Sequence, residues 1–161
     1  MKKSRGSKIY KTTLLQYFEE EIMGEAYFYG LTSTFDEPDQ REKLILLANV
    51  ERRAAEAVRP LLEKHGLEPR PDADLGYSGQ GWTEASGQSD WRAFITDMSV
   101  RYVGYVDDFE KLEQMAPSGD LPALKILTAH EVAAIEFANL ELAGDRDSAA
   151  PLRRYLAPDS E

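Results

Sequence analysis

The chain has 161 residues, of which 42% are hydrophobic and 30% charged, a composition typical of a single globular domain spanning 1–161. Its 19 basic and 29 acidic residues give a net charge of −10, which argues against a nucleic-acid-binding surface. The absence of cysteine excludes disulfides, thiol nucleophiles and cysteine-ligated metals, so a metal site here needs Asp, Glu, His, Tyr or water as ligands.

No run of about 18 apolar residues is present, so the sequence predicts no membrane-spanning helix. Leu14 and Leu15 are soon followed by Glu19, Glu20 and Glu21, which interrupt the apolar stretch that a signal peptide needs. We therefore expect a cytoplasmic protein. A homodimer is the expected assembly, because most soluble oligomers are dimers.

Two helices are predicted in the first part of the chain. Thr13 and Gln16 have the spacing of a capping box, so the first helix is expected over about 13–34. Residues 35–39 predict a turn, and Pro38 suits the first turn of a second helix over about 38–65. Gly66 then follows as its C-terminal cap.

The next segment, 67–88, is rich in Pro, Gly, Ser and Asp without a helical period, and it predicts a long irregular connection. Two further helices are expected over about 89–116 and 121–143, and a short one over about 151–156. A connection of about 20 residues can extend ~65 Å, more than the ~38 Å length of a 25-residue helix. The sequence therefore predicts an all-α, antiparallel four-helix bundle made of two helical hairpins joined by a long crossover.

Three of the expected apolar stripes carry a glutamate near their middle, namely Glu25, Glu51 and Glu131. Glu25 precedes the turn residue Asp36 by about as many positions as Glu51 follows Asp39, so the two stand at the same height in an antiparallel hairpin. Glu131 lies at a similar distance from the second turn. Because burial of an unpaired carboxylate is costly, this convergence predicts a metal ion, a buried arginine such as Arg101, or shared protons between them.

The segments 24–28, 47–51 and 129–134 resemble the metal-binding helices of the ferritin-like di-iron carboxylate superfamily, rubrerythrin-like proteins included. The resemblance covers about 10–145. It implies a ferritin-like bundle in which Glu25, Glu51 and Glu131 are metal ligands. Oxygen ligands suit iron or manganese, the ions that the resemblance implies.

The chain departs from the family pattern at both histidine positions, which are Ala54 and Ala134 here and cannot bind metal. On the third helix Tyr105 occupies the expected height, and Asp108 is the preferred fourth ligand over its neighbour Asp107. His130 is turned ~100° from Glu131 on the helix, so it is either a substitute ligand or a packing residue. Glu21, one turn before Glu25, is a further candidate for the inner cluster.

These observations predict a degenerate carboxylate metal site in the bundle core that binds iron or manganese with weak or lost redox activity. They identify no catalytic residue and leave open whether the protein is an enzyme. The alternative is a non-enzymatic helical bundle that acts as a binding or oligomeric interaction module without metal. In that case Glu51 or Glu131 would join an ion-pair network with Arg101 and tyrosines.

Overall fold

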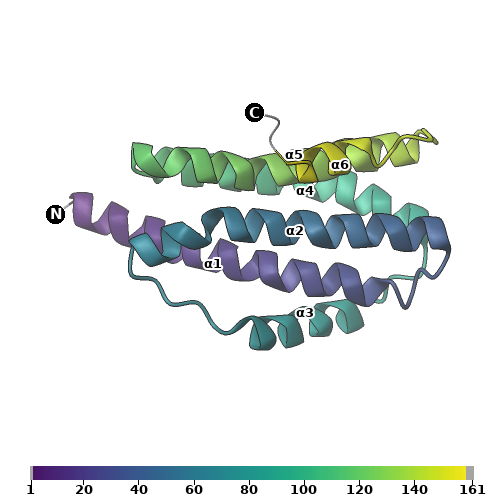
Figure 1. Ribbon diagram of the computed structural model, residues 1–161, viewed down its shortest axis with the longest axis horizontal. Helices are drawn as coiled ribbons and strands as arrows, with labels where there is room; N and C mark the ends of the chain where they lie inside the picture. The colour runs from purple at the N-terminus through teal and green to yellow at the C-terminus, as the bar shows by residue number, and fades with distance from the viewer. Residues whose placement is uncertain (1, 159–161) are drawn as a thin grey trace.

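The computed structural model describes residues 2–158, and this part of the chain contains α-helices and one short 3-10 helix but no β-strand. None of its helices is both long enough and apolar enough to cross a bilayer. The elements, shown in Figure 1, are α1 (Lys2–Leu31), α2 (Pro38–Lys64), α3 (Asp72–Ser86), α4 (Trp91–Met115), η1 (Ser118–Asp120), α5 (Leu121–Leu142) and α6 (Ala150–Leu156).

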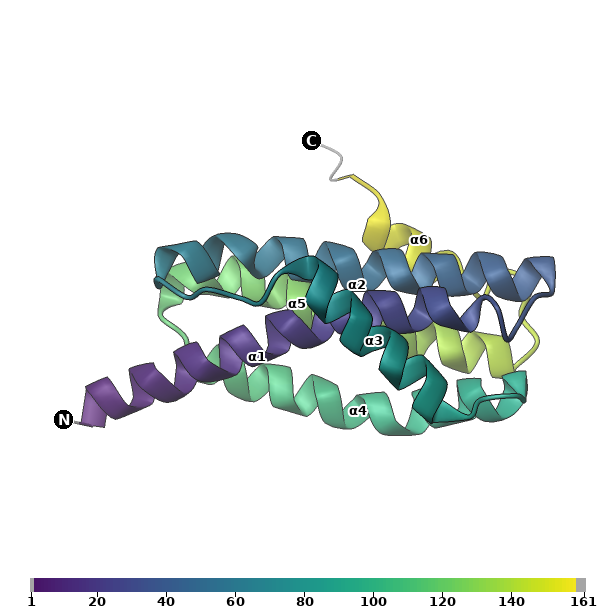
Figure 2. The same ribbon diagram turned by 90° about the horizontal axis from the view of Figure 1, so that it is seen from below.

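Four long helices, α1, α2, α4 and α5, lie side by side along the long axis of the molecule (Figures 1 and 2). α1 packs along α2, α4 packs along α5, and contacts between α2 and α5 join the two pairs. Contacts between α1 and α4 are sparser, and Figure 2 shows α1 crossing at an angle to α4. One side of the molecule is therefore less tightly closed than the others.

The apolar core is divided into two clusters that follow one another along the long helices. On α1 the first cluster ends at Met23 and the second begins at Phe28. On α5 the first cluster ends at Leu127 and the second begins at Ala133. Between them lies a layer of buried polar side chains, which is the feature that the fold positions for function.

The first helix begins at Lys2, so the expected start at Thr13 is wrong. Residues 7–12 contain no helix breaker, and Tyr10 is buried, with its hydroxyl donating a hydrogen bond of 2.6 Å to Asp120. This contact with a residue far along the chain stabilises the helical turns that precede Thr13. Thr13 and Gln16 have the spacing of a capping box, but they lie inside a helix that continues on both sides of them.

The connection over 67–88 is not irregular, because it contains the 15-residue helix α3. Asp72 and Asp74 lie in its first turn, where carboxylates are favoured by the helix dipole. Glycines lower its intrinsic propensity, but Gly79 lets α3 approach α1 so closely that an added Cβ would lie 2.2 Å from the carbonyl oxygen of Met23. Tertiary packing against α1 therefore decides this helix, which its composition alone did not reveal.

Candidate metal centre

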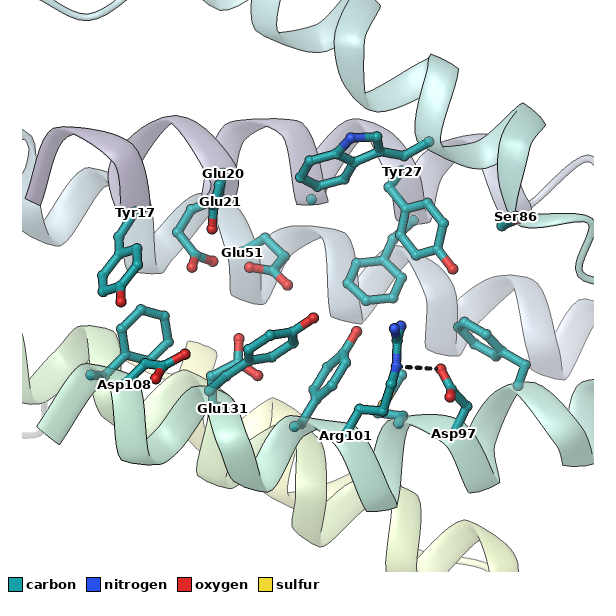
Figure 3. Close-up of a pocket in the computed structure, with 18 of the residues that line it drawn as sticks. Tyr17, Glu20, Glu21, Tyr27, Glu51, Ser86, Asp97, Arg101, Asp108 and Glu131 are labelled. Atoms are coloured by element: carbon teal, nitrogen blue, oxygen red, sulfur yellow. Dashed lines mark ion pairs between the residues drawn. The ribbon is translucent and has the colours of Figure 1, made fainter. Parts of the chain in front are cut away.

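Three glutamates and one histidine meet in the polar layer between the two apolar clusters: Glu21 from α1, Glu51 from α2, and His130 and Glu131 from α5. Each offers one ligand atom, and these atoms all lie within 4.8 Å of one another. The exposed fractions are 5%, 8%, 0% and 4% in that order. Figure 3 shows the carboxylates of Glu21, Glu51 and Glu131 directed toward a common space.

His130 is at the centre of this group. Its Nε2 lies 2.7 Å from a carboxylate oxygen of Glu21, 2.7 Å from one of Glu131 and 3.1 Å from one of Glu51. Its Nδ1 is bonded to the backbone carbonyl oxygen of Leu127, one turn earlier in α5. A carbonyl can only accept, so Nδ1 carries a hydrogen, and Nε2 faces the carboxylates with either a lone pair or a second proton.

Hydrogen bonding inside the cluster is incomplete. Nε2 of His130, Oε2 of Glu21 and Oε2 of Glu131 are buried without a hydrogen-bond partner among the described residues, despite the short distances between them. Unsatisfied buried polar atoms are rare in proteins and point to a group that completes them. The missing group must interact with a nitrogen lone pair and several carboxylate oxygens together, which is what a metal cation does.

The electrostatics of the cluster are those of anionic groups removed from water. Burial, reinforced by the charge of Glu21, raises the pKa of Glu51 well above its usual range. Burial also raises the pKa of Glu131. For His130, burial opposes the charged form, but the carboxylates of Glu21, Glu131 and Glu51 outweigh it and raise the pKa. Without a cation, the site therefore favours added protons.

Two aromatic side chains flank the ring of His130. The imidazole ring lies 5.7 Å from the ring of Phe109 and 6.5 Å from that of Tyr155, centroid to centroid. Tyr155 belongs to α6, and its hydroxyl donates a hydrogen bond of 2.9 Å to the carbonyl oxygen of Ile126. The short C-terminal helix thus covers the histidine and excludes water from that side.

The structure brings two of the four expected ligands into the cluster, Glu51 and Glu131, and places Glu25 outside it. Arg52 of α2 binds Glu25 through two hydrogen bonds, from Nε at 2.9 Å and from Nη2 at 2.7 Å. The same guanidinium pairs with Asp72 at the start of α3. Glu25 therefore contributes to a charged contact among α1, α2 and α3 rather than to the polar layer.

Asp108, the expected ligand from α4, is exposed and stands outside the cluster, although it lines the pocket in front of it. Within residues 2–158, α4 contributes no ligand to the cluster itself, and its tyrosines lie closest to the glutamates. Burial, with the charges of Glu131 and Glu51, raises the pKa of Tyr102 well above its usual range. Arg101 pairs with Asp97 at 2.9 Å, so the expected ion pair between it and the glutamates is not formed.

Glu21 and His130, which complete the cluster, were only secondary candidates in the sequence. The inner face of α1 passes through Leu14, Phe18, Glu21 and Phe28, whereas Tyr29 is 44% exposed. Steps of four and three residues from Leu14 and Phe18 reach Glu21, but the same steps also reach Glu25, so spacing alone does not choose between them. His130 stays on the inside because its ring is held back against its own helix by the bond to Leu127.

Comparisons of the chain with protein-family models, with curated proteins and with solved structures found no match. The site is therefore interpreted from its own geometry. What that geometry establishes is a helical protein with a buried group of glutamate and histidine side chains that could hold a metal ion.

Proposed function

We propose that this protein binds a divalent metal ion through Glu21, Glu51, His130 and Glu131. The observation that carries the proposal is the orientation of His130, whose Nε2 faces three carboxylate oxygens while its Nδ1 is held by the carbonyl of Leu127. A backbone carbonyl on the second ring nitrogen is the usual arrangement of a metal-binding histidine, because it sets the tautomer and directs the lone pair.

The dimensions of the cluster suit a single ion. Four ligand atoms no more than 4.8 Å apart lie within about 2.9 Å of a common centre, somewhat beyond the metal–ligand distances of ~2.0–2.2 Å for first-row metals. A small inward shift of flexible glutamates closes the difference. Two ions ~3.5–4 Å apart would need ligand atoms that are more widely separated and more numerous than these four.

Charge supports the same conclusion. At an effective dielectric constant of ~20, two carboxylates ~4.8 Å apart repel each other by about 3–4 kcal/mol. Three such pairs together reach about 10 kcal/mol, comparable to the whole stability of a typical domain. A divalent ion relieves this repulsion without leaving oxygens unpaired. The mixed oxygen and nitrogen ligands favour iron(II) or manganese(II) over magnesium or calcium, which prefer oxygen alone.

At the level of family, we propose a ferritin-like bundle whose metal site is degenerate, with His130 compensating for Ala54 and Ala134. The four long helices and the passage of the connection along the molecule support this assignment (Figure 1). A single bound ion favours weak or lost redox activity over a dinuclear oxygen-activating centre. A cytoplasmic homodimer forming one domain remains part of the proposal.

A metal-free polar network is the second candidate. The distances of 2.7–3.1 Å from Nε2 of His130 to the carboxylate oxygens favour it, because they suit an imidazolium among carboxylates. One positive charge would then face three carboxylates, so further protons would have to be taken up. The single proton on Nε2 cannot satisfy three carboxylates at once, and this counts against the metal-free network.

The test is metal uptake by protein stripped with a chelator. Anaerobic addition of iron(II), or of manganese(II), should give about one bound equivalent by elemental analysis. At a free metal concentration 100-fold above Kd, binding adds about 2.7 kcal/mol to the free energy of unfolding and raises Tm by about 5–10 °C. Absence of uptake together with an unchanged Tm would favour the metal-free network.

A matched pair of variants makes this test specific. Glu131→Gln removes a ligand oxygen from the cluster and should abolish binding. Glu25→Gln alters a half-buried glutamate that Arg52 holds outside the cluster, and it should leave the metal stoichiometry unchanged. Equal loss in both variants would contradict the assigned ligands.

A further inference from the structure

A pocket of about 690 Å³ lies directly in front of the cluster, bounded by α1, α3 and α4. Its inner wall contains Glu21, Glu51 and Glu131, whereas His130 lies behind them and does not line it. Figure 3 shows these carboxylates facing the same space as Tyr17, Tyr27 and Arg101. The volume is that of a site for a small organic molecule, and such a molecule would meet the metal-binding carboxylates at its inner end.

Aromatic side chains are the largest group in the walls of this pocket. Tyr27 and Phe28 come from α1, Trp82 from α3, and Tyr102 and Tyr105 from α4. Aromatic faces are negative at their centres and attract cations, with the strongest effect where water is partly excluded. The aromatic walls thus suit a ligand with an apolar body, a cationic group, or both.

The charge of the pocket decides which of these it suits. One arginine, Arg101, lines it, and that guanidinium already pairs with Asp97 at 2.9 Å. Six carboxylates line the pocket, namely Glu20, Glu21, Glu51, Asp97, Asp108 and Glu131. With all six ionised, a divalent ion and Arg101 would still leave a net charge of about −3. A cleft lined by one sign of charge concentrates the opposite charge and repels anions.

We propose that the pocket binds a small organic cation, an ammonium compound with an aromatic or other apolar body, next to the metal ion. One part of this inference rests on the proposed function: a metal ion bound at the inner wall would lie next to the organic cation, which would then be a candidate substrate. Recognition of the cation itself is a property of the aromatic walls and the outer carboxylates.

The test compares three ligands of similar size: 2-phenylethylamine, 2-phenylethanol and 3-phenylpropionate. Titration calorimetry on metal-free and manganese-loaded protein should give a Kd at least tenfold lower for the amine than for the alcohol, with the carboxylate weakest. Trimethyl(2-phenylethyl)ammonium cannot coordinate a metal and should bind like the amine. Equal binding of amine and alcohol, preference for the carboxylate, or no binding of any ligand would overturn the inference.

Variants away from the metal cluster locate the binding site. Asp108→Asn combined with Glu20→Gln should reduce the preference for the amine over the alcohol by at least threefold. Ser86→Trp fills part of the pocket from α3 and should weaken every ligand at least tenfold. Ala93→Trp, at an exposed position of α4 outside the pocket, is the matched control and should change no Kd. Loss of binding in the control equal to that in Ser86→Trp would also overturn the assignment.

The two proposals fail separately. Elemental analysis of the same samples reports the metal, and calorimetry reports the amine. Amine binding without metal uptake would support the pocket and reject the metal centre. Metal uptake without amine binding would leave the metal centre in place and reject the organic cation.

Discussion

Nε2 of His130 on α5 lies 2.7 Å from a carboxylate oxygen of Glu21 on α1, although α1 and α5 occupy opposite ends of the chain. The contact is buried, and both atoms lack a hydrogen-bond partner among the described residues. It therefore defines the point at which the two apolar clusters are separated by charged groups.

Glu21 should be as important for metal binding as Glu51. Glu21→Gln removes an anionic oxygen that faces His130, and it should raise the Kd for manganese(II) by more than about 100-fold, since loss of even an outer-shell partner costs 10–100-fold. Competition with a chromophoric chelator measures this change. Glu25→Gln lies one helical turn away, and an affinity loss of the same size there would contradict the placement of α1.

Metal should reverse the effect of Glu51→Gln on stability. In metal-free protein this variant should raise the free energy of unfolding by about 1–2 kcal/mol, because it removes a buried carboxylate beside that of Glu21. With manganese present, the variant should melt below wild type. Chemical unfolding with and without the ion measures both values. An unchanged stability of the metal-free variant would mean that Glu21 does not repel the Glu51 carboxylate. An unchanged stability with manganese would mean that this carboxylate binds no ion.

Gly79 should be required for the contact between α3 and α1. Gly79→Ala places a Cβ 2.2 Å from the carbonyl oxygen of Met23 and 2.8 Å from Cβ of Ala26, and it should lower the free energy of unfolding by about 1–3 kcal/mol. Gly81→Ala, in the same helix, meets nothing within 4 Å and should raise it by up to about 1 kcal/mol. Urea denaturation distinguishes them, and matching signs would disprove the close approach.

Asp120 should make the free energy of unfolding depend on pH in the acid range. This carboxylate is fully buried and accepts hydrogen bonds from Tyr10, Lys64 and His65, and although burial alone would raise its pKa, these bonds hold it below the usual 3.8. A lowered pKa stabilises the folded state above about pH 4, and the contribution is lost as the pH falls through the folded value.

Asp120→Asn should therefore unfold about 1–3 kcal/mol more easily at pH 7, with the difference from wild type shrinking below about pH 4. Urea unfolding at a series of pH values measures it. Asp107→Asn, at an exposed position of α4, is the control and should track wild type throughout. A difference for Asp120→Asn that persists at pH 3 would show that the side chain acts through packing instead.

Much of the helical framework follows from local signals in the sequence. Asp90 accepts a hydrogen bond from the backbone amide of Ala93 at the start of α4, and Gly66 and Gly144 adopt the left-handed conformation after α2 and α5. These residues act through their own backbone and the adjacent turn. Their effect is therefore visible without knowledge of the rest of the chain.

The sequence by itself determined that the chain is helical, that glutamates interrupt its apolar stripes, and that any metal must be held without cysteine, because these properties depend on residue types and on spacing along one helix. Only the tertiary structure decided which glutamates meet. Glu21 meets His130 of α5, Arg52 pairs with Glu25 outside the cluster, and the helix in the connection packs against α1 through Gly79 and Met23. Contacts between distant segments set these outcomes, and no local pattern encodes the rotation of one helix against another.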